Sequence, residues 1–259
     1  MSELPSEPQV GEELVRLASA DNFRDVAGPG HPTSDGGRVR RGVLFRSNEL
    51  QLTDADADSM RGLGITAVYD LRAAHEVEAH PDVPVPGATW HHLAVGGIPM
   101  DEVAALATRE QSLAAMLAVY RAFVEHPDAR ASFGELLTRL ATTDGAQLFH
   151  CTAGKDRTGW AAAVVLGLLG VPEEVVLEDY LLTNTFSTAT RDKYLAIIAE
   201  HLGPEKVEVY EAVMVADEAY LRTAWDAVAA SYGDLRGYVL DGLGVAPGDL
   251  EALLTRLRG

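Results

Sequence analysis

Residues 150 to 159 read HCTAGKDRTG, and this stretch decides both the fold and the chemistry expected of the chain. Arg157 follows Cys151 by six positions, and a hydroxyl residue, Thr158, comes directly after it. Such a spacing lets the loop curl so that successive backbone N–H groups converge on one tetrahedral anion, while the following helix directs its positive end to the same point. The stretch therefore predicts an oxyanion cradle with a sulfur atom at its base.

The sequence on either side gives this loop a strand before it and a helix after it. Gly145 precedes a short apolar run of strand-forming residues, Ala146 to Phe149. The apolar segment that follows the loop, Thr158 to Leu169, has the length of a helix and is ended by Gly170 and Pro172. We therefore expect a strand, loop and helix unit in which the helix amino terminus faces the loop.

Strand and helix patterns alternate through the first half of the chain. Ile65 to Leu71 reads as a buried parallel strand, and the polar residues Asp70 and Arg72 stand at its carboxyl end, where ligands bind in open α/β sheets. Further strands are predicted over 43–45 and 90–95, and helices over 54–61, 111–125 and 129–141. The rest of the chain after residue 172 is predicted to be helical over 173–182, 190–202, 205–215, 217–231 and 247–257. This alternation indicates an α/β fold, in one domain that spans residues 1–259.

Composition limits the partners and the compartment. The net charge of -18 repels nucleic acid and anionic membrane surfaces, so neither is expected as a partner, and any phosphate pocket must be positive locally. The chain has a single cysteine, which excludes an intramolecular disulfide and fits a reducing compartment. The start of the sequence lacks a signal-peptide pattern, and no apolar run approaches the roughly 20 residues of a membrane span. We expect a cytoplasmic protein without a transmembrane segment, with secretion by a signal-less route left open.

The loop residues have distinct expected roles. Cys151 is the candidate nucleophile, because the helix amino terminus and the charges of Lys155 and Arg157 favour its thiolate. Arg157 offers a planar fork that matches two phosphate oxygens. Thr158 is placed to donate its hydroxyl to the sulfur, both as thiolate and as leaving group. Phosphate and other oxyanions are also expected to contact Thr152, Ala153, Gly154 and Lys155.

The spacing C-x5-R-[ST] is the signature of the protein tyrosine phosphatase superfamily, and the fuller pattern HCxAGKDRTG is much more specific. Together with NFRD at 22–25, LFRS at 44–47 and YDLR at 69–72, it makes the chain resemble the bacterial tyrosine-protein phosphatase branch. The matching blocks span residues 21–185. The resemblance implies a three-layer α/β/α phosphatase fold with a short, mainly parallel central sheet and a helical C-terminal half. It also suggests a two-helix lid over residues 186–220.

The same resemblance implies a hydrolase for phosphate monoesters that works through a phosphocysteine and needs no metal or other cofactor. Phosphotyrosine in proteins is the expected substrate, and phosphoserine, phosphothreonine or phosphoinositides are accepted by some members of the superfamily. Lys155 could serve multiply phosphorylated or lipid substrates, and the sequence leaves a protein substrate equally open.

The leaving group needs a proton, and three aspartates are candidates for the general acid. By resemblance Asp156, inside the loop, ranks first; Asp70 ranks second and Asp25 third. Asp70 and Arg24 are also candidate substrate-binding residues, although an ion pair between Asp70 and Arg72 is an equally good interpretation. Polar contacts that fix the N-terminal segment near the loop are the alternative for Arg24.

Two other functions compete with the enzyme. A binding module could recognise phosphorylated partners without turnover, but every chemical group that turnover needs is present. Arsenate reduction or sulfur transfer at a similar anion loop would give Arg157 and Asp156 no chemical role. These reactions would also need a second cysteine, which the sequence lacks.

Overall fold

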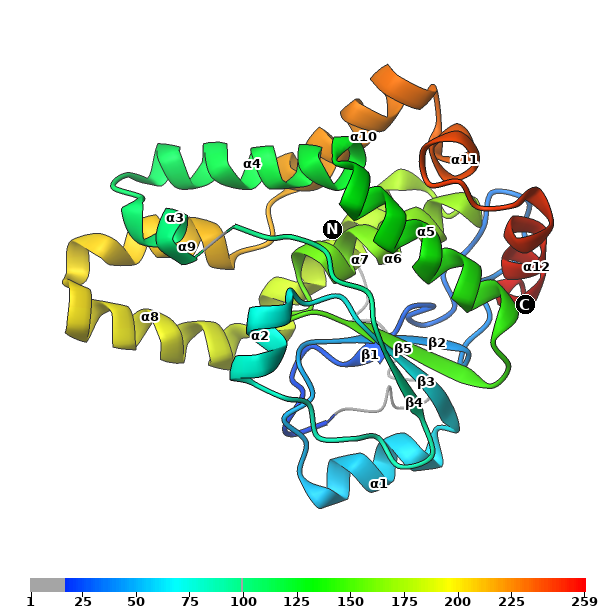
Figure 1. Cartoon of the computed structure of the whole chain (residues 1–259), viewed down its shortest axis with the longest axis horizontal. Coiled ribbons are helices and arrows are strands. Elements are labelled where there is room, and N and C mark those ends of the chain that lie inside the picture. The colour runs from blue at the N-terminus through cyan, green and yellow to red at the C-terminus, as the bar shows by residue number, and fades with distance from the viewer. Residues whose placement is uncertain (1–16, 99) are drawn as a thin grey trace, which may run out of the picture.

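The computed structural model describes residues 17–98 and 100–259. In this part of the chain a five-stranded sheet has the strand order β1-β2-β5-β3-β4 (Figure 1). β1 is antiparallel to β2, and all other neighbours are parallel. The strands are Arg24–Asp25 (β1), Leu44–Ser47 (β2), Ile65–Asp70 (β3), Thr89–His92 (β4) and Ala146–His150 (β5).

Helices make up most of the remaining structure, above all after β5. They are α1 (Asp54–Gly62), α2 (Ala74–Ala79), α3 (Met100–Ala105), α4 (Arg109–Glu125), α5 (Pro127–Thr142), α6 (Asp156–Leu168), α7 (Glu173–Phe186), α8 (Thr188–Leu202), α9 (Val207–Met214), α10 (Glu218–Tyr232), α11 (Leu235–Gly237) and α12 (Pro247–Leu257), with a 3-10 turn at Pro204–Lys206 and a π-helical turn at Tyr238–Gly242.

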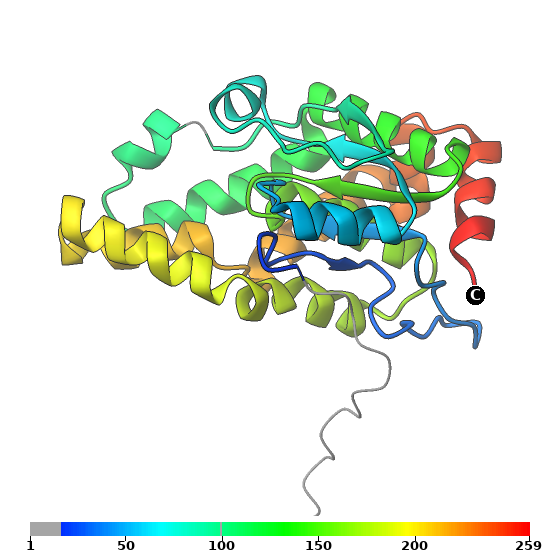
Figure 2. The same ribbon diagram turned by 90° about the horizontal axis from the view of Figure 1, so that it is seen from below.

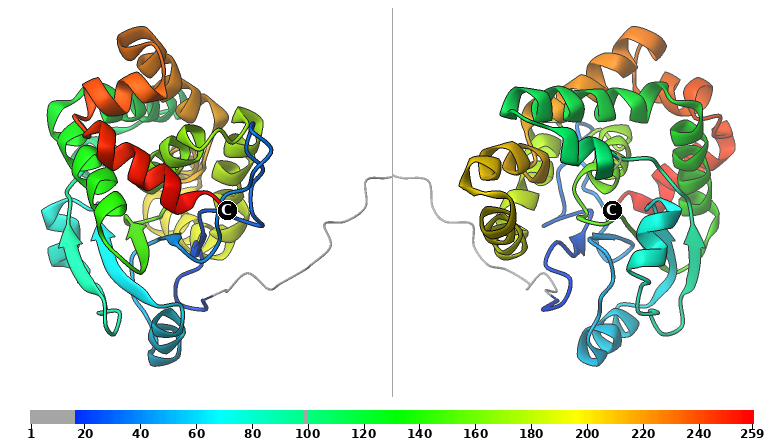
Figure 3. Two further views of the ribbon diagram at one scale, coloured as in Figure 1. Left: turned by 90° about the vertical axis from the view of Figure 1, so that its right-hand side faces the viewer. Right: turned by 60° about the vertical axis from the view of Figure 1, so that its left-hand side comes forward.

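Helices cover both faces of the sheet, as Figures 1 and 3 show, with α1 on one side and the larger helical layer on the other. Side chains alternate between the two faces along each strand. Tyr69 and Phe149 join the large apolar cluster under α4 to α7, while Val68 and Leu148 join the smaller cluster that includes Met60 of α1. The predicted three-layer α/β/α fold with a mainly parallel sheet is confirmed.

β5 occupies the middle of the sheet, between β2 and β3. All of its residues are buried, as expected for a parallel strand covered on both faces. At its carboxyl end His150 lies level with Ser47 of β2 and Asp70 of β3. The loop that follows, residues 151–155, therefore starts where three strands end together, and α6 begins directly after it.

Most of the predicted elements are present, but short elements such as α2 and β1 were not predicted. α2 has six residues and buries none of them, so its sequence carries no apolar period from which a helix could be recognised. β1 is only two residues long. Thr53 caps α1, because its side chain accepts a hydrogen bond from the backbone N–H of Asp56 at 3.3 Å.

Residues 188–214 form a projecting arm, made of α8, the 3-10 turn and α9. Figures 1 and 2 show α8 and α9 running side by side away from the sheet. α8 has no buried residue, whereas α9 buries Val209 and Ala212 and packs along α4. The predicted two-helix excursion at 186–220 is thus present, and its function as a lid stays a prediction. None of the helices in the described residues is long and apolar enough to cross a bilayer.

Gly154 provides a test of how tightly the loop is held. Its φ is +65°, and a Cβ on it would lie 2.5 Å from the carbonyl oxygen of Ser47. Gly42 is the control: its φ is +75°, but a Cβ on it would meet no atom within 4 Å. Gly42→Ala therefore measures the backbone strain without the steric clash. We expect Gly154→Ala to lower the free energy of unfolding by about 1–3 kcal/mol more than Gly42→Ala. Urea unfolding measures both, and equal losses would show that the loop yields freely.

Candidate active site

The loop between β5 and α6 presents a row of unpaired backbone donors. Among the described residues, no acceptor receives a hydrogen bond from the backbone N–H groups of Thr152 to Arg157. Buried backbone donors are nearly always paired, and Gly154, Lys155 and Arg157 are buried within this run, so their unpaired N–H groups make the loop a candidate anion site. Cys151 lies at the start of this run and is 2% exposed. The helix amino terminus of α6 adds its dipole to the same place.

Three buried cations lie close enough to Cys151 to interact with it. Burial lowers the pKa of Lys155, and charge interactions with Asp156 and Cys151 oppose that fall. Burial likewise lowers the pKa of Arg46, to about 10, while Cys151 acts to raise it. For Arg157, burial is outweighed by a hydrogen bond to Glu76 and the interaction with Cys151, so its pKa rises. The sulfur thus sits in a positive environment inside an acidic protein.

Glu76 of α2 is a functional residue that the sequence did not reveal. Its carboxylate binds both terminal nitrogens of Arg157, with Oε2 at 2.6 Å from NH1 and Oε1 at 2.9 Å from NH2. The hydroxyl of Thr152 donates to the same carboxylate. Burial raises the pKa of Glu76, but the hydrogen bond and charge of Arg157 outweigh it and lower that pKa to about 2. Glu76 therefore fixes the guanidinium at the rim of the loop.

Two side chains hold the carbonyl groups of the loop, so that its N–H groups face the opposite way. Arg46 of β2 donates from NH2 to the carbonyl oxygen of Gly154 at 2.9 Å. The side-chain amide of Asn22 donates to the carbonyl oxygen of Ala153 at 3.0 Å. The LFRS and NFRD blocks thus each supply a direct support for the loop.

A buried carboxylate, Asp179 of α7, compensates the charge of these supports. It lies 3.0 Å from NH1 of Arg46 and 3.4 Å from Nε of Arg24. Burial raises the pKa of Asp179, but the charge of Arg24 and its other partners lower it well below the usual range. The Arg24 guanidinium donates to Asn22, Asp179 and Thr183, which links the N-terminal segment to α7. Its predicted contact with substrate stays a prediction.

Asp70 and Arg72 form the centre of a second buried network, next to the base of the loop. Nε of Arg72 lies 3.0 Å from Oδ1 of Asp70, and NH2 lies 2.7 Å from Oδ2. The same NH2 group lies 2.9 Å from Asp82, whose other oxygen lies 3.1 Å from Nε2 of His150. Asp70, Asp82 and His150 are close enough together to hold a metal ion, but the guanidinium already supplies a cation to this group. Both oxygens of Asp70 are bound to Arg72, and the His150 ring lies beside Asp82.

The three candidate acids occupy different environments. Asp156 is the first residue of α6, and its side chain is 25% exposed beside the loop. Asp70 is fully buried against Arg72. Asp25 accepts hydrogen bonds from the backbone of Ala27 and Gly42, and burial raises its pKa. Of the three, only Asp156 lies next to the loop and is partly exposed, so it remains the first candidate for the general acid.

The contacts of Lys155 and Thr158 differ from those that the sequence predicted. The Lys155 ammonium is buried and donates to the carbonyl oxygens of Val213 and Val215, the latter at 3.1 Å, where the arm returns to the core. The Thr158 hydroxyl is fully buried and has no hydrogen-bond partner within the described residues. It makes no hydrogen bond to the Cys151 sulfur in this structure, so its predicted donation to the sulfur stays a prediction.

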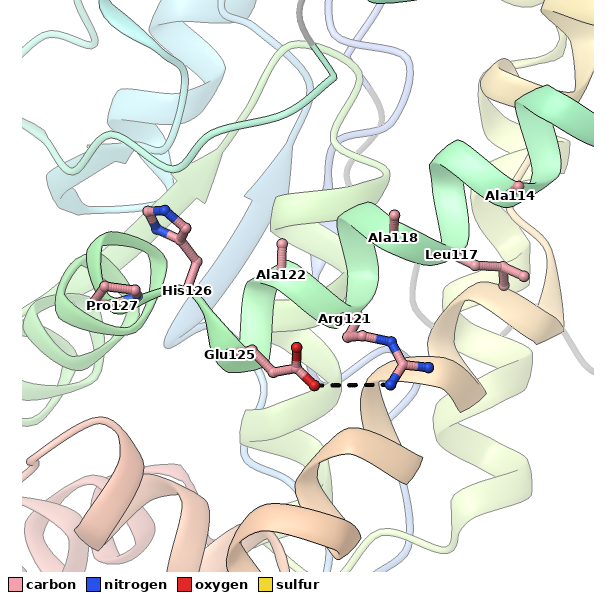
Figure 4. A pocket seen from close by; sticks show the side chains of 8 residues that line it. All are labelled: Ala114, Leu117, Ala118, Arg121, Ala122, Glu125, His126 and Pro127. Carbon is pink, nitrogen blue, oxygen red and sulfur yellow. Dashed lines mark ion pairs between the residues drawn. The ribbon is translucent and has the colours of Figure 1, made fainter.

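A groove elsewhere on the molecule does not provide a competing site. It runs along α4 to the start of α5, where Ala114, Ala118 and Ala122 line up on one side (Figure 4). Its charged members, Arg121 and Glu125, pair with each other at 3.8 Å. The lining also includes His126 but holds no cysteine, serine or threonine, so the loop after β5 is the stronger candidate for the chemistry.

An anion loop of this form, carried between the central strand of an α/β/α fold and a buried helix, defines the protein tyrosine phosphatases as a class of hydrolase. The protein is an enzyme of that class. More narrowly, the chain belongs to the tyrosine phosphatase family whose model matches residues 15–259.

Two relatives illustrate the membership. Triple specificity protein phosphatase PtpB of Mycobacterium tuberculosis is 31% identical over 278 residues, which cover 94% of this chain and 97% of that protein. A tyrosine-protein phosphatase of Nostoc commune is 27% identical over 273 residues, covering 95% of this chain and 89% of its own length. The likeness thus extends over nearly the whole chain, beyond the motif blocks.

The pair of Glu76 and Arg157 should make stability depend on pH in acid. The pKa of Glu76 is about 2 in the folded chain and 4.5 ordinarily, so its contribution to stability is complete above pH 4.5 and is lost as the pH falls toward 2. We expect the free energy of unfolding to fall by about 2 kcal/mol from this source between about pH 5 and pH 3. Urea unfolding of Glu76→Gln should lack this part of the fall. Glu78→Gln, an exposed change on the same helix, should keep it; a Glu76→Gln profile as steep as the parent's would contradict the assignment.

Proposed function

We propose that the enzyme hydrolyses phosphate monoesters through a phosphocysteine on Cys151. The observation that carries this proposal is the run of unpaired backbone N–H groups from Thr152 to Arg157 around that buried sulfur. Six successive unpaired donors beside a guanidinium are the kind of groups that stabilise the equatorial oxygens of a phosphoryl group in transfer. The attacking atom in this proposal is the Cys151 sulfur, which interacts with the charges of Lys155, Arg46 and Arg157.

The reaction then has two balanced steps. In the first, the Cys151 thiolate attacks phosphorus, the bond from phosphorus to the ester oxygen breaks, and that oxygen takes a proton from Asp156. In the second, water attacks the phosphocysteine, Asp156 takes a proton from the water, and the thiolate leaves. Thr158 donates its hydroxyl to the sulfur as it leaves. Arg157 holds the phosphoryl oxygens in both steps.

Phosphorylated proteins, with phosphotyrosine first, are the proposed substrates, and phosphoinositides are the second candidate. The relative from Mycobacterium tuberculosis is named as a triple specificity protein phosphatase, which supports a broad range. The position of Lys155 favours the protein substrate, because its ammonium is committed to the carbonyl groups of Val213 and Val215. A lysine that read the extra phosphates of a lipid headgroup would need that ammonium free.

The nucleophile can be tested directly. Cys151→Ser should reduce phosphate release from p-nitrophenyl phosphate on the order of 10³-fold or more and still bind vanadate. Rapid denaturation of the wild-type enzyme during turnover should trap phosphate on Cys151, detected as an added phosphate mass on the peptide that contains it. A Cys151→Ser variant that works at the wild-type rate would contradict the mechanism, and loss of vanadate binding as well would point to a misfolded loop.

Substrate preference can be tested with a panel. Phosphotyrosine peptides should be hydrolysed with a higher kcat/KM than phosphoinositides in matched detergent. Lys155→Met should reduce both by the same factor if the ammonium acts only on the loop and the arm. A reduction confined to phosphoinositides would instead assign Lys155 to the lipid headgroup and reverse the proposed preference.

A further inference from the structure

A chain of buried hydroxyl groups ends on the carboxylate of Asp156. The Tyr120 hydroxyl, from α4, donates to Oδ1 of Asp156 at 2.9 Å. The Tyr180 hydroxyl, from α7, lies 2.7 Å from the Tyr120 hydroxyl. Three helices that are far apart in the sequence therefore meet at one oxygen of the residue that starts α6.

The direction of the hydrogen bonds along this chain is fixed. A phenol has one proton to donate, and Tyr120 gives its proton to the carboxylate, so Tyr180 must give its own to the Tyr120 oxygen. Both tyrosine hydroxyl protons are therefore directed along the hydrogen bonds toward Asp156.

Both phenols stay protonated under all ordinary conditions. Tyr120 is 0% exposed and Tyr180 is 1% exposed. Burial, followed by the nearby charge of Asp156, raises the pKa of each phenol well above 10. They act as fixed donors and do not exchange protons with the substrate.

The neighbouring Tyr220 shows what an ordinary buried phenol does in the same cluster. It is also 0% exposed, and its ring lies 5.7 Å from that of Tyr120. Its hydroxyl donates to the carbonyl oxygen of Ala212 at 2.7 Å, which satisfies it within the protein scaffold. Tyr120 instead donates its hydroxyl proton to a carboxylate that is one quarter exposed at the edge of the loop.

The arrangement treats the two oxygens of Asp156 differently. Tyr120 binds Oδ1, and the Lys155 ammonium lies 3.4 Å from the same oxygen. Within the described residues no hydrogen bond is donated to Oδ2. One oxygen is anchored, and the other is left to carry a proton.

We propose that Tyr120, supported by Tyr180, is a positioning residue that holds Oδ1 of Asp156 so that Oδ2 delivers the proton to the leaving oxygen. This inference rests on the proposed function, in which Asp156 is the general acid. Tyr120 touches neither substrate nor phosphate and acts only through Asp156. A carboxylic acid held by one oxygen keeps the other in a fixed place relative to the loop, and proton transfer depends steeply on such placement.

Leaving groups of different acidity provide the test. The value of kcat/KM covers the step in which the ester oxygen departs, and a positioned acid matters more for phenyl phosphate than for p-nitrophenyl phosphate, whose phenolate leaves without help. Asp156→Asn should reduce kcat/KM for phenyl phosphate at least about 10²-fold more than for p-nitrophenyl phosphate. Tyr120→Phe should show the same selectivity at about tenfold. The double variant should be no more selective than Asp156→Asn alone.

Tyr220→Phe is the matched control, because it removes a hydroxyl of equal burial that does not contact Asp156. It should change the two substrates by the same factor. Thermal unfolding and vanadate binding of Tyr120→Phe should stay close to wild type, which separates positioning from misfolding. If Tyr120→Phe is misfolded, Tyr180→Phe tests the same chain from its far end and should show a smaller selective loss.

The outcomes separate the two proposals. If Asp156→Asn is selective and Tyr120→Phe reduces both substrates equally, or neither, the positioning role is overturned while the proposed function stands. If Asp156→Asn shows no selectivity, the acid in the proposed function is wrong and the positioning role falls with it. If Cys151→Ser remains active, the failure lies in the proposed mechanism itself.

Discussion

Three buried cations interact with a single sulfur atom and a fourth, Arg24, lies beside one of them, and the rest of the structure depends on how their charge is balanced. Arg24, Arg46, Lys155 and Arg157 are each 8% exposed or less. Burying even one unpaired charge is costly, so each needs a carboxylate or a set of carbonyl groups as partner. An acidic chain supplies such partners readily, and carboxylates lie against Arg24, Arg46 and Arg157.

The partners come from segments that lie far from the loop in the sequence. Asp179 forms ion pairs with Arg24 and Arg46, and Glu76 forms an ion pair with Arg157. Arg72 has its own acidic partners beside β3, which keeps that network separate from the loop. The result is a rigid support for carbonyl groups on one side and free N–H groups on the other. That division is what makes a short loop an anion site.

The sequence could predict the parts of this arrangement that are local. The strand, the loop and the helix are contiguous in the sequence. Apolar runs bounded by glycines and a proline predict the strand and the helix, and their bounds agree with the structure to within two residues over 146–168. Glu76 could not be predicted, because α2 has no apolar face and its partner lies 81 positions away. Tyr120 and Tyr180 read as core aromatics, and only the crossing of three helices brings them to Asp156. Arg24 and Asp70 were recognised as important from their motifs, but motifs do not tell whether a side chain points to a ligand or to another residue.

The ammonium of Lys155 links the loop to the arm in a way that constrains both. Its partners include the carbonyl groups of Val213 and Val215, at the negative end of α9. Displacing that helix end would strip a buried cation of its acceptors, and the free energy of doing so would have to come from a new partner at the same nitrogen. Any movement of the arm is therefore coupled to the loop through the Lys155 ammonium, and removing that ammonium would loosen the end of α9 from the loop.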